Sequence, residues 1–331
     1  MPTSSLLALA ALLVITGGAG ATAPQCTDVE APPAPVCVST PYGLAYADTG
    51  AEADVAAGAL RDTGQRFALH FGSAPVGALI LTTTLDPLVA RDFAKSHGLD
   101  YAQVWLPAKA KRTMTERAMR QAGLDRARIN RALAQLADRD AVTLRHEVGH
   151  AMYAALYWPD AEGSLEQRYG TPAPDWLDEA AAILMETPES QARHLASFID
   201  AARERRDSIP GLADFLQAEH PVRSAALARA LARGPRSQSG VQMMVASGAG
   251  FPGVDTFYGQ SLLVGLFLAE TSGEPTILAP VSAAIADGET FEQWLAQHGP
   301  RYRLPDTVAG LQPLWDAWLQ QVTTRGAAGK S

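Results

Sequence analysis

The chain has 331 residues, of which 47% are hydrophobic and 19% are charged, so it can bury the core of one large domain or two ordinary ones. Its formal net charge is -8 and its isoelectric point is about 5.4, which excludes the overall basic excess typical of nucleic-acid-binding domains. The densest cationic stretch, Lys109 to Arg112, is interpreted as a solvated surface. We therefore expect a globular protein that does not bind nucleic acid.

The N-terminus has the layout of a secretory signal. An unbroken apolar run from Leu6 to Ile15 is followed by small residues that end in Ala21-Thr22-Ala23, so cleavage is expected after Ala23. The run is too short to span a bilayer, although the absence of a preceding Lys or Arg leaves an uncleaved membrane anchor as the alternative. We expect a secreted or periplasmic protein that does not bind membranes once residues 1–23 are removed.

Both cysteines, Cys26 and Cys37, follow this signal directly. No Cys or His pair at ligand spacing accompanies them, which argues against zinc binding by the cysteines. Because an exported protein meets an oxidising compartment, we expect a disulfide that staples an extended, proline-rich strap at 24–40. Two free, buried thiols are the alternative.

The region that follows alternates between helical and strand patterns, and the rest of the chain is mostly helical. The predicted strands are 78–83 and 103–106. The predicted helices are 53–71 closed by Gly72, 90–96, 117–137 with a break near Gly123, 141–157, 175–186, 189–206, 211–218, 225–232, 257–271, 276–286, 290–298 and 308–322. The glycine-rich segment from Ser237 to Asp255 is interpreted as a mobile loop, and 323–331 as a disordered tail.

The most informative segment is His146-Glu147-Val148-Gly149-His150, inside the predicted helix at 141–157. Residues four apart share one face of a helix, with Cβ atoms about 5–6 Å apart, so the two imidazoles can bind one metal ion. Glu147 can then reach a metal-bound water, which is the zinc and general-base arrangement of metallopeptidases. The helix is apolar on most sides, and burying these three side chains without partners would cost several kcal/mol. Two core histidines and an ion-paired glutamate are the alternative interpretation.

A catalytic zinc takes three protein ligands and keeps one position open. The metzincin pattern is excluded, because Tyr153 and Leu156 stand where it needs Gly and His. Glu179, on the predicted helix at 175–186, can serve instead if that helix returns antiparallel to the first. Asp178 is the competing ligand, but neighbouring residues face different directions, so only one of the two should point at the metal. A preference of acidic residues for the first turn of a helix is the other explanation for both.

These segments resemble a known family. HEVGH at 146–150 and WLDEAAA at 176–182 are similar to the gluzincin clan of zinc metallopeptidases, whose signature is HExxH followed by a W-L-x-E-G/A helix. Within the clan, the likeness is to the bacterial peptidase MA-like proteins. YGQSLLV at 258–264 is similar to the family's tyrosine-glycine-x-serine helix, and the short helices that end at 311–319 are similar to its C-terminal pattern. The resemblance covers roughly 53–322, but Ala180 replaces a frequent Gly, and the G-x-M-E-N element of the aminopeptidase branch is absent.

The resemblance implies a zincin-like domain at 41–322, with a small α/β lobe at 41–157, a helical lobe at 158–322 and the active-site helix between them. One zinc ion would be held by His146, His150 and Glu179. Glu147 would be the general base, and Tyr258 would donate to the oxyanion; a core aromatic beside Phe257 is the alternative for this tyrosine. Trp176 and Asp178 would lie in the shell behind the ligands, with Trp176 packing the helix and orienting Glu179. The remaining histidines are interpreted as surface or structural residues: His70, His97, His194, His220 and His298.

We therefore expect an exported zinc metallopeptidase that hydrolyses peptide or protein substrates, with the glycine-rich loop as a lid. The missing G-x-M-E-N element puts exopeptidase activity in doubt. The alternative is a catalytically degenerate protein of the same fold that binds zinc and peptides without turnover, although the intact Glu147 argues against it. A helical protein with a chance motif is a third hypothesis.

Overall fold

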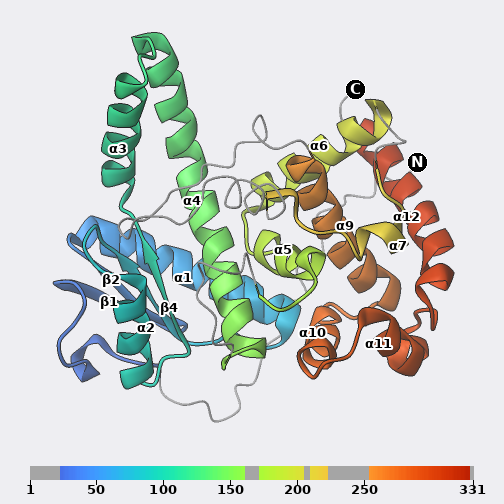
Figure 1. The fold of residues 1–331 in the computed structure, drawn as a ribbon. Helices are drawn as coiled ribbons and strands as arrows, with labels where there is room; N and C mark the ends of the chain where they lie inside the picture. The colour runs from blue at the N-terminus through green and yellow to red at the C-terminus, as the bar shows by residue number, and fades with distance from the viewer. Residues whose placement is uncertain (1–22, 161–170, 205–208, 223–252, 329–331) are drawn as a thin grey trace, which may run out of the picture.

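A computed structural model describes residues 23–160, 171–204, 209–222 and 253–328 of the protein (Figure 1). A four-stranded sheet lies in the N-terminal part and helices make up most of the rest, so the predicted α+β, mainly helical class is confirmed. The predicted signal up to residue 22, the predicted helix at 225–232 and the glycine-rich segment from Ser237 up to residue 252 lie outside the described residues. Among the described helices, none combines the length and the apolar character needed to cross a bilayer.

The sheet has the strand order β1-β2-β3-β4, with β1 antiparallel to β2 and the other neighbours parallel. Its strands are Val36–Thr40, Gly43–Ala47, Gly77–Leu81 and Tyr101–Trp105. β3 and β4 correspond to the two predicted strands, whereas β2 was not predicted and β1 is the last part of the expected strap. Helices α1 (Gly50–Phe71) and α2 (Pro87–Ser96) form the crossovers between the parallel strands.

The side chains of the central strands alternate between two cores, as the period of two along a strand requires. Leu44, Tyr46, Ala78 and Ile80 pack with α2, whereas Ala45, Ala47, Leu79 and Leu81 pack with α1. The core on the α1 side continues without interruption into the helical part of the protein. The sheet therefore has one face closed by α2 and the N-terminal strap and one face that supports the rest of the molecule.

A helical hairpin follows the sheet and is formed by α3 (Ala108–Gln121) and α4 (Arg126–Tyr157). The break predicted near Gly123 is present, and the side chain of Asp125 caps α4 by accepting a hydrogen bond from the backbone of Arg128. The sequence predicted two separate helices at 117–137 and 141–157, but α4 joins the second half of the first to the second without a break. Figure 1 shows α3 and the first half of α4 projecting away from the body, while the second half of α4 runs between the sheet part and the helical part.

The helical part surrounds α5, a nine-residue helix in which every residue is buried. α4 and α9 pack against it, and α6 packs on α9. The helices in this part are α5 (Asp175–Ile183), α6 (Pro188–Glu204), α7 (Leu212–Phe215), α9 (Val254–Ser272), α10 (Leu278–Ala286), α11 (Phe291–His298), the 3-10 helix η3 (Gly299–Tyr302) and α12 (Val308–Ala328). α12 extends into the segment at 323–331 that the sequence predicted to be disordered.

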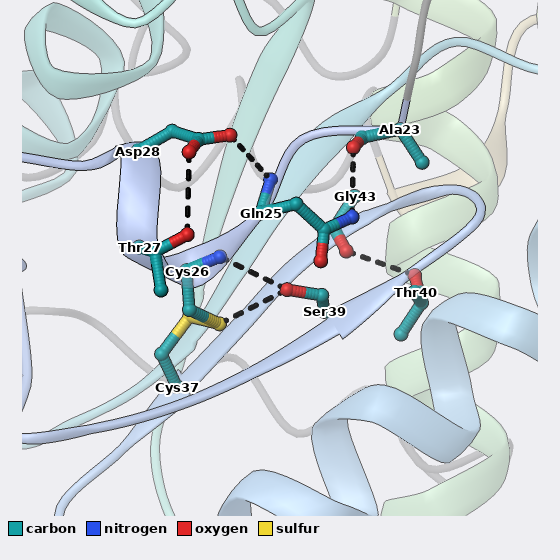
Figure 2. Close-up of a disulfide and its surroundings, with 9 residues drawn as sticks. All are labelled: Ala23, Gln25, Cys26, Thr27, Asp28, Cys37, Ser39, Thr40 and Gly43. Carbon is teal, nitrogen blue, oxygen red and sulfur yellow. Dashed lines mark hydrogen bonds between the residues drawn. A yellow bond between two sulfur atoms is a disulfide. The ribbon is translucent and has the colours of Figure 1, made fainter.

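The N-terminal strap is held by the expected disulfide (Figure 2). Cys26, at the start of the short 3-10 helix η1 (Cys26–Asp28), is bonded to Cys37 on β1, with the two Cα atoms 5.8 Å apart. Ser39 accepts a hydrogen bond from the backbone of Cys26 at 3.0 Å and donates one to its sulfur at 3.2 Å. The disulfide and these contacts tie the strap to the edge strand of the sheet.

Candidate metal centre

Three side chains converge where α4 packs against α5. Nε2 of His146 lies 3.1 Å from Nε2 of His150, and Oε2 of Glu179 lies 3.4 Å from the first nitrogen and 3.9 Å from the second. In a tetrahedral zinc site, metal–ligand bonds of about 2.0–2.1 Å place neighbouring ligand atoms roughly 3.3 Å apart. The structure therefore brings the three predicted ligands together at the spacing that a single ion requires.

The burial of Glu179 supports a cation at this point. The residue is 1% exposed, and neither of its carboxylate oxygens accepts a well-formed hydrogen bond from the described residues. Its nearest polar neighbours are imidazole nitrogens at 3.4 Å and beyond. A buried carboxylate without donors is costly, whereas the same carboxylate beside a metal ion is satisfied. The residues present therefore fit a bound metal.

Each of the two candidate histidine ligands has a second carboxylate at its other ring nitrogen. Nδ1 of His146 lies 2.9 Å from Oε1 of Glu186, and Nδ1 of His150 lies 3.4 Å from Oδ2 of Asp178. A histidine that binds a metal commonly donates its remaining N–H to such a carboxylate, which sets the tautomer and leaves the opposite nitrogen for the ion. Both Nε2 atoms are therefore directed at the same point, next to Glu179.

These carboxylates make the site strongly attractive to positive charge. Burial alone would lower the pKa of His146, but the close approach of Glu179, the hydrogen bond to Glu186 and the charges of both carboxylates outweigh it and raise the pKa well above its usual value. Burial would also lower the pKa of His150, but the negative charges of Asp178 and Glu179 outweigh this effect and raise the pKa above its usual value. The same negative field that holds protons on the imidazoles would favour a divalent cation at their shared point.

Asp178 and Glu179 face different directions, as neighbouring residues on a helix do. The Asp178 carboxylate accepts hydrogen bonds from the backbone N–H of Thr171 at 3.3 Å and from the Thr171 hydroxyl at 3.0 Å, and it faces the outer nitrogen of His150. Glu179, one residue on, faces the two Nε2 atoms instead. Asp178 thus lies behind His150, and Glu179 is the acid that completes the group of three.

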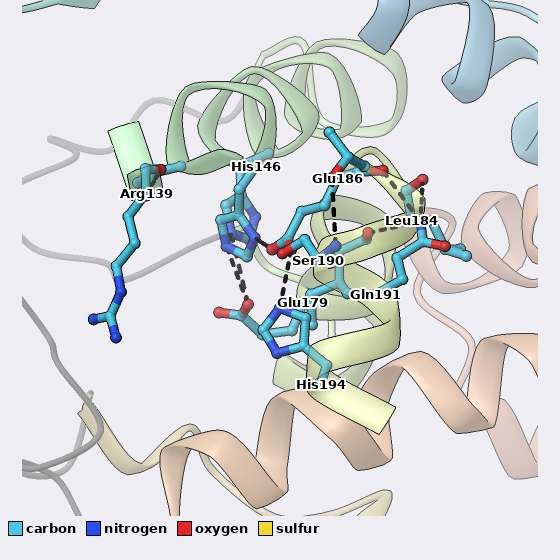
Figure 3. A network of polar contacts seen from close by, with 12 residues as sticks. Arg139, His146, Glu179, Leu184, Glu186, Ser190, Gln191 and His194 are labelled. Carbon is cyan, nitrogen blue, oxygen red and sulfur yellow. Dashed lines mark hydrogen bonds and ion pairs between the residues drawn. The ribbon is translucent and has the colours of Figure 1, made fainter. Parts of the chain in front are cut away.

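Glu186 lies at the centre of a hydrogen-bond network that the sequence did not predict (Figure 3). Besides His146, it accepts hydrogen bonds from the hydroxyl of Ser190 and from Nε2 of His194, the latter at 2.9 Å. Burial would raise the pKa of Glu186, but the hydrogen bonds and charges of His146 and His194 hold it well below its usual range. Gln191 secures the turn that carries Glu186, by donating to the backbone carbonyls of Ile183, Leu184 and Glu186.

His220 is a further residue that sequence reasoning missed, because it was interpreted as surface or structural. It is fully buried, and its Nε2 lies 3.5 Å from Oε1 of Glu179. Its Nδ1 accepts a hydrogen bond from the backbone of Val222 at 3.1 Å, so in the neutral ring the proton is on Nε2 and faces Glu179. The backbone N–H of His220 donates to Asp175 at 2.7 Å, which anchors the segment to the start of α5.

Tyr258, the predicted oxyanion donor, lies beside the histidine cluster. Its ring centroid is 5.8 Å from that of His146, 5.7 Å from His194 and 5.4 Å from His220. The neighbouring Gly259 makes this approach possible, because a β-carbon there would lie 2.6 Å from Cβ of Phe198 on α6. The tyrosine-glycine pair therefore brings α9 close to α6 and places the phenol ring next to a candidate ligand.

Glu147 and Trp176 also lie near the candidate ligands. Glu147 is partly exposed next to His146, and its charge acts on Lys111, whose ammonium is ion-paired with Asp140 at 2.6 Å. Trp176 is fully buried and packs edge-on against Phe291 at 5.6 Å, so it holds α5 against α11. The contact with Phe291 agrees with the predicted packing role of Trp176. The predicted orienting effect of Trp176 on the Glu179 side chain stays a prediction.

Sequence spacing alone carried little signal for Glu186, His194 and His220, because each is a single polar residue on a different segment. Only Glu186 could have been suggested by spacing, since it stands two helical turns beyond Glu179 in the predicted helix at 175–186.

Comparison of the chain with known protein families, with curated proteins and with solved structures finds no match.

Proposed function

We propose that the protein is an exported zinc-dependent metallopeptidase. The observation that carries the proposal is the convergence of one ligand atom each from His146, His150 and Glu179 within 4.8 Å of one another, with a second carboxylate behind each imidazole. Chance placement of two histidines in a core would not supply a buried third acid or the two outer carboxylates. The disulfide between Cys26 and Cys37 is compatible with export, since such bonds persist in oxidising compartments.

The donor set favours zinc over other common ions. Two imidazole nitrogens and one carboxylate oxygen are the ligands of many catalytic zinc sites, and they leave a fourth position for water or substrate. Calcium and magnesium prefer oxygen ligands alone, so they are poor candidates for this group. Other first-row transition metals accept the same donors, and analysis of the metal content distinguishes them.

When bound, zinc supplies a Lewis acid that polarises the scissile carbonyl and lowers the pKa of a water ligand. Glu147, on the residue after the first ligand, would accept the proton of the attacking water on its carboxylate and pass it to the leaving amine. Tyr258 would donate its phenolic hydrogen to the developing oxyanion. Glu186, Asp178 and His220 would orient the three ligands and so keep the site rigid.

A substitution of the general base tests this function most directly. Glu147→Gln should keep one zinc per chain and lose peptide hydrolysis by about 10²–10⁴-fold, because the ligands stay intact while proton transfer is removed. Glu189→Gln is the matched control, since Glu189 is fully exposed and outside the site. Metal content by mass spectrometry and cleavage of a broad peptide library are the two measurements.

The outcomes separate the hypotheses. Equal cleavage by the wild type and Glu147→Gln would refute the mechanism, and a wild type without stoichiometric metal would favour a chance motif. A wild type that holds zinc and binds peptides but cleaves none of the library would favour the non-catalytic alternative.

A further inference from the structure

The hairpin at residues 108–136 carries a charge opposite to that of the rest of the chain. It contains eight Lys and Arg residues and two acidic residues, so its net charge is +6 in a protein whose overall formal charge is -8. We call this segment the cationic arm; it comprises α3 and the first part of α4. Figure 1 shows it projecting from the body, which separates its field from that of the acidic remainder.

Most of the arm's charge is exposed and not neutralised internally. Only Lys111, Ile129 and Leu133 are buried within 108–136. Arg120 and Arg128 pair with Glu116 and Asp125. The other exposed cations form no ion pair within the described part of the chain: Lys109, Arg112, Arg117, Arg126 and Arg131. Four of these five are arginines, whose planar guanidinium matches a carboxylate in a bidentate geometry.

The composition of the arm disfavours nucleic acid and lipid as its partner. No Phe, Tyr or Trp occurs between 106 and 152, so the arm lacks the aromatic rings on which unpaired bases usually stack. Met114 is the one large apolar residue of the arm that is exposed, whereas helices that enter a bilayer surface present a continuous apolar face. A polypeptide with acidic side chains instead offers carboxylates that match the exposed guanidinium groups of the arm.

A cavity at the base of the arm adds a place for an apolar side chain. It has a volume of about 210 Å³, lies between α3 and α4, and is separate from the metal centre. Leu133 and Leu136 form its apolar wall, with Lys109, Arg112 and the ion pair of Lys111 and Asp140 around it. An apolar residue flanked by carboxylates would match both parts of this lining.

The second half of the arm and the two candidate histidine ligands belong to one helix, α4. Arg131 and His146 are 15 positions apart on α4, which corresponds to about 22 Å along the helix axis at 1.5 Å per residue. An extended peptide covers that distance with roughly seven residues. The arm could thus hold one segment of a polypeptide while another reaches the metal.

We propose that the cationic arm binds an acidic segment of the polypeptide substrate, with an apolar residue of that segment in the cavity at its base. This inference rests on the proposed peptidase function. It adds a substrate class: polypeptides in which a run of Asp or Glu lies several residues from the bond that is cut.

The test measures binding without turnover, in zinc-loaded Glu147→Gln protein. The probe is a fluorescently labelled peptide of glutamates with one central leucine, and the readout is its anisotropy. In this background, replacing Arg117, Arg126 and Arg131 by Gln should weaken binding about tenfold, because three exposed carboxylate contacts are lost. The charge-matched control replaces Arg61, Arg91 and Arg193, which are exposed outside the arm, and should bind nearly as the parent does. Far-ultraviolet circular dichroism checks that both variants are folded.

Two outcomes would overturn the proposal. Equal weakening in the arm variant and its control would mean that only net charge matters. Tighter binding of the parent to anionic phospholipid vesicles or to an oligonucleotide than to the glutamate peptide would assign the arm to another partner. Neither outcome depends on hydrolysis, so each is distinguishable from a failure of the peptidase function itself.

Discussion

Gly149 and Ala182 are in direct contact where α4 meets α5. A β-carbon built on Gly149 would lie 3.0 Å from Cα of Ala182 and 2.9 Å from Cγ of Met185. The glycine inside the HEVGH segment therefore lets the two helices approach until Glu179 reaches the imidazoles. Because Cα of Ala182 belongs to the backbone, it cannot move aside as the end of a flexible side chain can.

Adding a single methyl group at this contact should separate the two helices. We expect Gly149→Ala to destabilise the protein by about 1–3 kcal/mol, as overpacking of a core does, and to weaken zinc binding. Gly58→Ala is the control, since Gly58 is in the middle of α1 and a β-carbon there meets nothing within 4 Å. That substitution should instead stabilise by roughly 0.5–1 kcal/mol through helix propensity. Urea unfolding and zinc titration measure both effects; a Gly149→Ala protein as stable as Gly58→Ala would contradict the contact.

Glu186 should control zinc affinity although it does not reach the ion. Glu186→Gln removes the negative charge that accepts hydrogen bonds from His146 and His194, so we expect zinc affinity to fall about 10–100-fold. Glu189→Gln, three residues further along the chain and fully exposed, should leave the affinity unchanged. Competition with a chelator gives the affinities, and equal values for the two variants would assign Glu186 a purely structural role.

His220 should position Glu179. His220→Ala removes the ring whose Nε2 lies 3.5 Å from Oε1 of Glu179, and we expect zinc affinity to fall about tenfold. His220→Gln keeps an N–H donor on a side chain of similar reach and should restore part of the loss. Zinc titration of the two variants distinguishes a loss of positioning from a loss of packing, because a packing defect alone would show no recovery in the Gln variant.

The disulfide should stabilise the strap and leave the metal centre unaffected. Replacing Cys26 and Cys37 by Ser opens a loop whose ends are 11 residues apart, and we expect stability to fall by about 2–3 kcal/mol. Zinc content should not change, because both cysteines contact the sheet edge rather than α4 or α5. Thermal unfolding with and without reducing agent is the check: reductant should lower the midpoint of the wild type and leave that of the Ser variant unaltered.

The candidate ligands were predictable because local geometry relates two of them. His146 and His150 share a helix face through the helical period, and an acid on a later helix was the remaining way to complete a zinc site. Glu186 offered only its spacing of two helical turns from Glu179, and His194 and His220 offered no spacing at all, because only tertiary packing brings them near α4. The roles of these three residues depend on distances between side chains in the folded protein, and their spacing along the sequence does not determine those distances.

In the fold, too, features set by local sequence patterns were predictable and features set by tertiary packing were not. Long periodic helices such as α1 and α9 were predicted within a few residues of their ends. β2, a five-residue strand with a buried run of Gly, Leu, Ala, Tyr and Ala, has no alternation that would distinguish it from other apolar segments. The continuity of α4 was missed because polar residues around Arg139 weaken the apolar pattern, while the packing of α3 and α5 along its length supports it.

The unbroken course of α4 has a mechanical consequence. Between Arg126 and Val148 it contains neither proline nor glycine, the usual causes of a kink, so this stretch of helix behaves as a stiff rod. A force on the tip of the rod would therefore tilt the helix as far as His146 rather than bend it between the tip and this imidazole. The imidazole of His146 would then move relative to Glu179, which is anchored on α5, so a load at the tip would change the spacing of these two candidate ligands.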